Sequence, residues 1–249
     1  MYRRKYLLLK SILRNFYDLS YKPYGFKFYT TFHFVMVFII ITAGILLYKP
    51  YLKNKKLKVL LQVIPIVLEL IRLALVYNTE YFMPSYLPFN LCIWGTYFLV
   101  LDLLFKDSRF VKACLFYLFM TGAILALIFP DWGQLNKYSY VSMISWIIHG
   151  ILVMVPLYMI IDGVYKPKFL DIKYPLLFIG GVLPVIKYLN AKFDANFFYI
   201  NEPSPGSPLE IIYKYSPNYI LALVIITTLV MCLVYFIYNF INLLITRRN

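Results

Sequence analysis

Charged side chains are scarce in this chain, and the acidic ones are outnumbered by the basic ones. Only 14% of the 249 residues are charged, with 11 acidic against 25 basic, whereas 62% are apolar and 20% are aromatic. Soluble domains contain about 25% charged and about 45–50% apolar residues. A single soluble core of this length has no room for so much apolar surface, and the same excess excludes intrinsic disorder.

Cysteine is also rare, which excludes several common architectures. The three cysteines, Cys92, Cys114 and Cys232, are odd in number and all lie inside apolar stretches. A disulfide framework needs paired cysteines, and a zinc site needs paired, closely spaced ligands. Neither a glycine-rich phosphate loop nor a haem motif is present. We therefore expect no metal and no organic cofactor.

Long apolar stretches are what the chain has in abundance. A helix that crosses a bilayer needs about 20 mostly apolar residues. Seven stretches approach or exceed this length, at residues 31–48, 59–77, 86–105, 110–129, 139–161, 175–190 and 219–245. They predict an all-α, polytopic membrane protein with its transmembrane helices in one bundle. The sixth stretch is short and contains Gly180, Gly181 and Pro184, so we expect that helix to be kinked or broken.

The connecting loops alternate in charge, which predicts how the chain is oriented. The loops after the first, third and fifth helices and the C-terminus hold 13 Lys and Arg residues, and the loops on the other, outer side hold three. Because Lys and Arg concentrate in cytoplasmic loops, the C-terminus of this multi-pass cell-membrane protein is expected in the cytoplasm. The net charge of +14 is then explained by basic loops that lie next to anionic lipid headgroups, and we expect no nucleic acid partner.

Two segments lie outside the predicted helices. Residues 1–29 hold seven basic residues and no apolar run long enough for a cleavable signal peptide. Seven spans place the N-terminus outside, so either these residues form an amphipathic segment on the outer headgroups or the helix count is off by one; we prefer seven spans. Residues 30–249 form the seven-helix domain. Within it, the outer loop 191–218 contains Pro203, Pro205 and Pro208, which prevent a long helix. This loop is either a lid over an outward-facing cavity or a plain connector with an aromatic anchor at residues 197–199.

Ionisable and nucleophilic side chains within the apolar stretches gather on the outer side. Such groups are expensive in lipid and are functional candidates by default. They are Glu69, Arg72, Cys92, His149 and His33. Glu69 and Arg72 have the i, i+3 spacing of a helical ion pair, and Ser145 lies on the His149 face one turn earlier. Asp102 and Asp162 lie near the inner ends, where the neighbouring lysine loops explain them.

The spacing leaves structural and catalytic interpretations open. Cys114 and Cys232 are expected to be packing residues. A lone intramembrane His is often a satisfied hydrogen-bonding group, and a Glu–Arg pair is often a structural bridge. In the catalytic interpretation, His149 activates the Cys92 thiol, with sulfur and imidazole about 3 to 4 Å apart. Asn90 lies about 200° from Cys92 on a regular helix, so it shares that face only where Pro84 and Pro88 distort the turn.

A resemblance to a known family adds to this interpretation. Residues 87–92 (LPFNLC) resemble the PLHLC signature of the YwaF-like bacterial integral membrane proteins, which are similar to the eukaryotic transmembrane protein 164 acyltransferases. The resemblance extends from residue 33 to about residue 219. It includes Glu69, Thr121-Gly122-Ala123, Pro130-Asp131, His149-Gly150, Pro156-Leu157-Tyr158, Asn190, Ala195-Asn196-Phe197, Pro203 and Pro217.

The resemblance implies a seven-helix enzyme that moves fatty acyl chains between glycerophospholipids. It implies Cys92 as the acyl-carrying nucleophile and His149 as the base. The family histidine two residues before the cysteine is Asn90 in this chain, which puts the rate, the substrate or the activity itself in question. Asn90 or Arg72 would stabilise the oxyanion, and Glu69 would orient Arg72 or His149.

The expected partners are membrane phospholipids and lysophospholipids. His33, Ser145, Asn190 and Asn196 are expected to contact the substrate. The first alternative is a lipid ester hydrolase that uses the same Cys/His site with water as the acceptor. The second is a protein without this chemistry, either a permease-like passage lined by Glu69, Arg72 and His149 or a scaffold. No inverted repeat is evident in the spacing of the helices, which argues against a transporter.

Overall fold

The structure is a computed structural model that describes residues 17–18, 29–77, 79–80 and 82–246. Within these residues every regular element is helical and no strand is present, so the all-α prediction is confirmed. Seven helical spans are long and apolar enough to cross a membrane, as predicted. They are Thr31–Lys53 (α2), Lys55–Tyr77 (α3), Pro84–Leu104, Arg109–Ile128, Tyr140–Ile161 (α7), Phe169–Phe193 and Tyr219–Leu244.

Three of the spans contain more than one element. The third span joins a short 3₁₀ turn, Pro84–Tyr86, to α4 (Leu91–Leu104). The fourth consists of α5 (Arg109–Ala113), a π-helix over Cys114–Met120 and α6 (Thr121–Ile128). The sixth joins a 3₁₀ turn, Phe169–Ile172, to α8 (Lys173–Phe193). The last span lies within α10 (Tyr219–Thr246), which follows the short α9 (Leu209–Tyr215).

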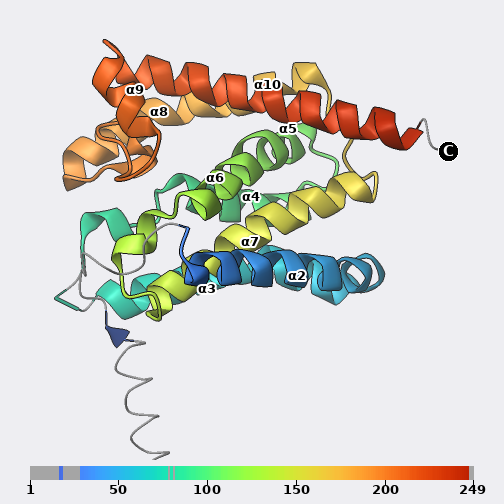
Figure 1. The fold of residues 1–249 in the computed structure, drawn as a ribbon, viewed down its shortest axis with the longest axis horizontal. Coiled ribbons are helices and arrows are strands. Elements are labelled where there is room, and N and C mark those ends of the chain that lie inside the picture. The colour runs from blue at the N-terminus through green and yellow to red at the C-terminus, as the bar shows by residue number, and fades with distance from the viewer. Residues whose placement is uncertain (1–16, 19–28, 78, 81, 247–249) are drawn as a thin grey trace, which may run out of the picture.

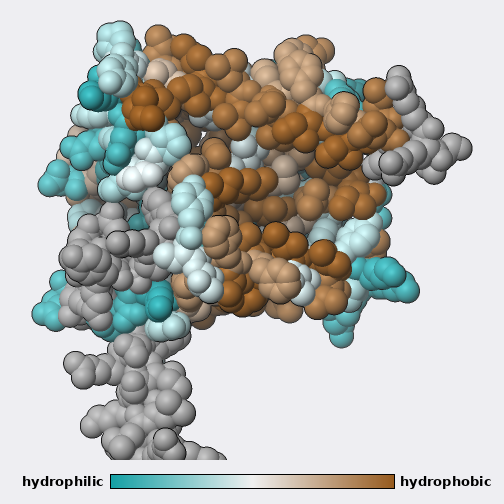
Figure 2. Space-filling model, in the orientation of Figure 1, coloured by the Kyte–Doolittle hydropathy of each residue, from teal (hydrophilic) through white to brown (hydrophobic). Residues whose placement is uncertain are grey.

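The bundle is built around α7 and the fourth span, which contribute most of the core. α7 packs against α2, α3, α4 and α6, and α8 and α10 cover the π-helix of the fourth span from the other side (Figure 1). α2 and α10 expose large apolar side chains, such as Ile45 at 71% and Phe240 at 61%. Hydrophobic residues cover the middle of the molecule and hydrophilic residues gather at the ends of the helices (Figure 2). A soluble monomer rarely exposes such a surface, so it is the face that meets lipid.

The sixth helix was predicted to be kinked or broken, and it is not broken. α8 runs without interruption through Gly180, Gly181 and Pro184. Proline in a helix removes one backbone hydrogen bond and crowds the carbonyl four residues earlier, which here belongs to Gly180. The surroundings of Gly180 are open, because a Cβ atom built there meets no other atom within 4 Å. Pro184 therefore removes one backbone hydrogen bond from α8 without interrupting the helix.

The irregular span is instead the fourth. All seven residues of the π-helix are buried, and three of them are the aromatic residues Phe116, Tyr117 and Phe119. A π-helix widens the backbone ring by one residue, and such segments are frequent at functional sites. No periodicity in the sequence indicated it. Cys114, predicted to be a packing residue, is fully buried at its start.

The polar groups near the inner ends are paired as expected. Lys112 Nζ lies 3.0 Å from Asp102 Oδ1, and Lys58 Nζ lies 3.8 Å from Asp162 Oδ2. The predicted amphipathic segment 1–29 lies almost entirely outside the described residues. Among its few described residues, Asp18 accepts a hydrogen bond of 3.2 Å from Asn136 Nδ2, which places Asp18 beside the start of α7.

Candidate active site

A cavity of about 780 Å³ opens at the end of the bundle where α4, α7 and α10 begin. We call it the site cavity. It is lined by α3, the segment before α4, the π-helix and α6, α7, α8, the loop after α8, and α10. Seven of the nine predicted site residues line it: Glu69, Arg72, Asn90, Cys92, Ser145, His149 and Asn196. Residues on separate helices, far apart in the sequence, therefore line one site cavity.

The start of α4 positions Cys92. Pro84 opens the 3₁₀ turn, and Asn90 has an extended backbone (φ −66°, ψ 153°) that makes it the N-cap residue of α4. Because α4 begins at Leu91, Cys92 is the second residue of that helix. Asn90 precedes the helix, so the angle of about 200° that would separate Asn90 from Cys92 around a regular helix does not apply. Both side chains line the cavity.

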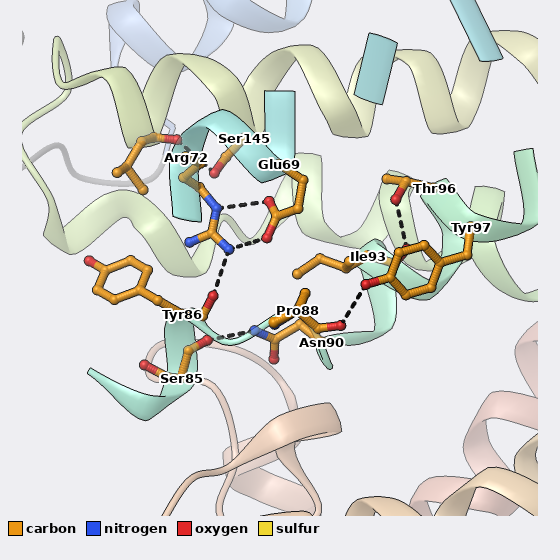
Figure 3. A network of polar contacts seen from close by, with 11 residues as sticks. Glu69, Arg72, Ser85, Tyr86, Pro88, Asn90, Ile93, Thr96, Tyr97 and Ser145 are labelled. Atoms are coloured by element: carbon orange, nitrogen blue, oxygen red, sulfur yellow. Dashed lines mark hydrogen bonds and ion pairs between the residues drawn. The ribbon is translucent and has the colours of Figure 1, made fainter. Parts of the chain in front are cut away.

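Side chains hold the carbonyl groups of the segment before α4 (Figure 3). A non-helical backbone at membrane depth leaves carbonyl oxygens that must find donors within the protein. Arg72 Nη2 donates to the Tyr86 oxygen at 3.1 Å, and Asn90 Nδ2 donates to the Ser85 oxygen at 2.9 Å. The Tyr97 hydroxyl donates to the Pro88 oxygen at 3.1 Å. These three bonds fix the path of the chain into Cys92.

Glu69 and Arg72 form the predicted pair, and both are buried. Arg72 Nε donates to Glu69 Oε2 at 2.8 Å, and Arg72 Nη2 also donates to Glu69 Oε1. The guanidinium carbon lies 5.3 Å from the centre of the Tyr86 ring. A bidentate pair of this kind compensates charges that would each cost at least about 2.5 kcal/mol alone in lipid. Arg72 Nη1 makes no hydrogen bond with the described residues, so it is available to a ligand.

His149 has a defined ring orientation. Its Nδ1 lies 2.7 Å from the Ser145 carbonyl oxygen one turn earlier. A carbonyl oxygen only accepts, so Nδ1 carries the proton and Nε2 of the neutral ring holds the lone pair. The ring also stacks on Trp132, with centroids 4.7 Å apart and an interplanar angle of 28°. Ser145 contributes through this carbonyl, because its hydroxyl donates to the Val141 oxygen at 2.9 Å.

Cys92 and His149 line the same cavity but are not hydrogen-bonded to each other. No hydrogen bond joins the Cys92 thiol to the His149 ring in the described part of the chain. The close sulfur–imidazole pair expected from the sequence is therefore not preformed as a hydrogen bond. Both side chains nevertheless line one cavity.

Two residues predicted to contact the substrate, His33 and Asn190, bond to backbone groups and do not line the site cavity. His33 Nδ1 accepts from the Tyr29 backbone N–H at 3.2 Å, and Nε2 donates to the Leu127 oxygen at 2.8 Å, so both ring nitrogens are used. Asn190 donates to the Phe197 oxygen at 3.1 Å and accepts from the Phe197 N–H at 2.7 Å. Both residues are buried, and neither lines the site cavity. His33 joins α2 to α6, and Asn190 fixes the loop to α8.

The loop 191–218 contributes to the mouth of the cavity. Asn196 lines the cavity, but its amide is bonded to the backbone of Asn201 and Glu202. Phe197 is fully buried beside α8, whereas Phe198 and Tyr199 line the cavity. The Tyr199 hydroxyl donates to the Asp131 carboxylate. Burial and, after it, the Asp131 carboxylate raise the pKa of this hydroxyl well above 10.

Asp131, Trp132 and Tyr199 are site residues that the sequence analysis did not single out. Pro130-Asp131 belonged to the family resemblance, which was a signal that could have pointed to Asp131. Tyr199 was expected only as an interfacial anchor. Trp132 had no signal, because its contact with His149 depends on how the turn after α6 folds back on α7.

The remaining lining of the cavity is largely apolar. α6, α8 and α10 contribute side chains such as Leu125, Leu183, Val224 and Val230. An aliphatic lining of this size accommodates a hydrocarbon chain. The site thus combines a thiol, an imidazole and a guanidinium with an apolar compartment.

Fold and site together define a seven-span membrane protein with a polar cavity at one end of its bundle. Residues 28–235 match the TMEM164 family, and the chain belongs to that family. The match confirms the resemblance to the transmembrane protein 164 proteins and does not extend to the YwaF-like bacterial label. No curated protein and no solved structure matches the chain.

Proposed function

We propose that this protein is an intramembrane acyltransferase that exchanges fatty acyl chains on glycerophospholipids through a thioester on Cys92. The observation that carries the proposal is that Cys92 and His149, from different helices, line one cavity whose remaining walls are largely apolar. A phospholipid has an ester group between a polar and an apolar part. The cavity likewise combines polar side chains with apolar walls, which supports a lipid ester as substrate.

The first step forms the thioester. His149 Nε2 takes the thiol proton while Cys92 Sγ attacks the ester carbonyl carbon of a donor phospholipid. The ester C–O bond then breaks, and the lysophospholipid oxygen leaves with the proton from His149. The acyl chain stays on sulfur and lies in the apolar part of the cavity.

The second step transfers the chain. The hydroxyl group of an acceptor lysophospholipid gives its proton to His149 and attacks the thioester carbonyl carbon. The C–S bond breaks, sulfur recovers the proton, and a new phospholipid leaves. Because the site lies among membrane helices, acyl chains can enter from the bilayer, and limited access of water protects the thioester from hydrolysis.

The electrostatics of the cavity favour these steps. Cys92 is the second residue of α4, so negative charge on sulfur lies at the positive end of the helix dipole. The oxyanion that forms on the carbonyl oxygen needs preorganised donors. Arg72 Nη1 is available for this role, and Asn90 keeps one amide proton beyond its bond to Ser85. Since Cys92 and His149 are not hydrogen-bonded, proton transfer requires a small side-chain movement or one bridging water, as is common in empty sites.

A trapped acyl adduct tests the proposal directly. Purified protein is reconstituted in vesicles with a phospholipid that carries an isotope-labelled acyl chain, with and without a lysophospholipid acceptor. Intact-mass analysis should show one acyl group on Cys92 that hydroxylamine removes. Cys92→Ser should abolish the hydroxylamine-sensitive adduct, whereas Cys232→Ser, the same change outside the cavity, should leave transfer unchanged. His149→Gln should lower the transfer rate about 10²- to 10⁴-fold, the range of a general base.

The same assay separates the alternatives. Release of labelled free fatty acid without an acceptor would indicate the lipid ester hydrolase instead. Unchanged lipid exchange by Cys92→Ser, with no acylation of Cys92 in the parent protein, would refute the covalent mechanism. Substrate flux in vesicles that survives Cys92→Ala but not Glu69→Gln would support the permease-like alternative.

A further inference from the structure

A second cavity, of about 300 Å³, lies at the end of the bundle opposite the site cavity. α2 and α4 end there, α3 and α5 begin there, and α7 ends beside it. We call it the basic pocket. Its charged lining consists of the lysines Lys55, Lys58, Lys106 and Lys112 and the aspartates Asp102 and Asp162. The positive charges therefore outnumber the negative ones by two.

Both aspartates are already neutralised. Lys112 and Asp102 are buried and form an ion pair, and Gln62 Nε2 donates to the other Asp102 oxygen at 2.9 Å. Asp162 pairs with Lys58, whose ammonium group also lies 5.2 Å from the centre of the Tyr51 ring. Their carboxylates therefore do not repel an incoming anion as free charges would.

Two lysines are left without a counter-charge. Lys55 and Lys106 are exposed, and neither forms an ion pair with any described residue. They come from different elements, since Lys55 begins α3 and Lys106 follows α4. Lys112 Nζ donates to the Lys106 backbone oxygen, which holds the backbone carrying this lysine beside the pocket. The pocket thus offers two convergent ammonium groups to an anion.

Part of the exposed lining of the pocket is apolar. Val59 is 41% exposed and Val164 is 54% exposed, and both line the pocket. A volume near the lower limit for ligand sites, which is about 300 Å³, holds a headgroup but not a whole lipid. A ligand with an anionic head and aliphatic chains can place the head between the lysines and the chains on Val59 and Val164.

We propose that the basic pocket binds the phosphate group of an anionic membrane lipid, with Lys55 and Lys106 as its counter-ions. Basic pockets between transmembrane helices are a recurrent way of binding lipid headgroups. The site is separate from the site cavity, so it does not depend on acyl transfer. Lysines near a membrane also attract anionic lipids without any defined site, and the test must separate these two effects.

The test is native mass spectrometry of the purified full chain in detergent with added phosphatidylglycerol or phosphatidylcholine. Lys55→Gln/Lys106→Gln should weaken phosphatidylglycerol binding at least about tenfold and leave phosphatidylcholine binding unchanged. The matched control is Lys53→Gln/Lys56→Gln, which removes two charges from the same end of the bundle but outside the pocket. This control should change the affinity less than about twofold. Thermal unfolding in detergent verifies that both variants are folded.

Three results would overturn the proposal. An equal loss in both double variants would mean general surface attraction, and no loss in either would mean that the pocket binds no anionic lipid. Inorganic phosphate is added in a separate arm. If it displaces phosphatidylglycerol with comparable affinity, the ligand is a soluble phosphate and not a lipid.

Discussion

At the scale of single residues, the site depends on side chains that hold backbone groups. Glu69 orients Arg72, and Arg72 holds the Tyr86 carbonyl in the segment that leads into Cys92. His149 is oriented in the same way by the Ser145 carbonyl and by Trp132. Few of the predicted polar residues are therefore free to bind substrate, and several instead position the two groups that are proposed to react.

Arg72→Lys tests this positioning role. Lysine keeps the charge but loses the planar fork, so it cannot bond Glu69 twice and reach Tyr86 as well. We expect acyl transfer to fall at least about tenfold and the free energy of unfolding to fall by roughly 1–3 kcal/mol. Both are measured in purified protein, by lipid mass spectrometry and by thermal unfolding.

Arg109→Lys is the control for this change. Arg109 forms a similar bidentate pair with Asp171, at 2.7 and 2.6 Å, outside the site cavity. The Arg109→Lys protein should have a lower free energy of unfolding but an unchanged rate of acyl transfer per folded molecule. If the two variants lose activity equally at the same folded fraction, Arg72 has no special role in the site.

At the scale of elements, the close packing of α4 places Cys92 against the rest of the cavity. A Cβ atom at Gly95, one turn after Cys92, would lie 2.9 Å from Leu152 Cδ2 and 3.2 Å from Phe119 Cβ. The glycine therefore allows α4 to approach α7 and the π-helix. Any larger residue has to push these elements apart.

Gly95→Ala should lower the free energy of unfolding by roughly 1–3 kcal/mol, because the added methyl group overpacks this contact. The effect is measured by thermal unfolding in detergent. Gly180→Ala is the control, since its Cβ meets no atom within 4 Å and alanine is the better helix former. A Gly95→Ala protein as stable as Gly180→Ala would show that α4 is not held this closely.

The loop after α8 is held over the cavity mouth by the bond between Tyr199 and Asp131. Tyr199→Phe removes this bond, so amide hydrogen exchange in residues 196–212 should accelerate. Tyr215→Phe, on the exposed face of α9, should leave exchange unchanged.

Because the pKa of Tyr199 is raised well above 10, the hydroxyl stays protonated. Its contribution is complete below about pH 10 and is lost as the pH rises above that value. After correction for the base-catalysed rise of intrinsic amide exchange with pH, a loss of protection in this loop already between pH 7 and 9 would contradict this assignment.

At the scale of the whole molecule, the two ends of the bundle differ in chemistry. One end holds the site cavity with its thiol, imidazole and guanidinium, and the other holds the basic pocket. The basic loops predict that the pocket end and the C-terminus face the cytoplasm. The site cavity then opens toward the opposite face of the membrane.

A pair of reporters tests this orientation. A fluorescent protein fused after residue 249 should fluoresce in intact cells, and a cysteine placed at Gly206 should react with a membrane-impermeant thiol reagent added outside. Gly206 is exposed in the loop 191–218, outside any helix. The same cysteine at Lys166, in a loop at the opposite end, should react only after permeabilisation. The reverse labelling pattern would contradict the predicted topology.

The sequence by itself determined the helical class, the seven spans and the placement of the candidate nucleophile and base near one end. Apolar length and periodicity depend only on neighbouring residues, so these properties are readable without coordinates. Only the tertiary structure decided that His33 and Asn190 bond to backbone groups outside the site cavity, that the fourth span contains the irregular helix and the sixth is continuous, and that Trp132 and Tyr199 join the site. The reason is physical, because a polar side chain takes its role from the backbone groups that other helices bring within reach, and no local pattern specifies which groups those are.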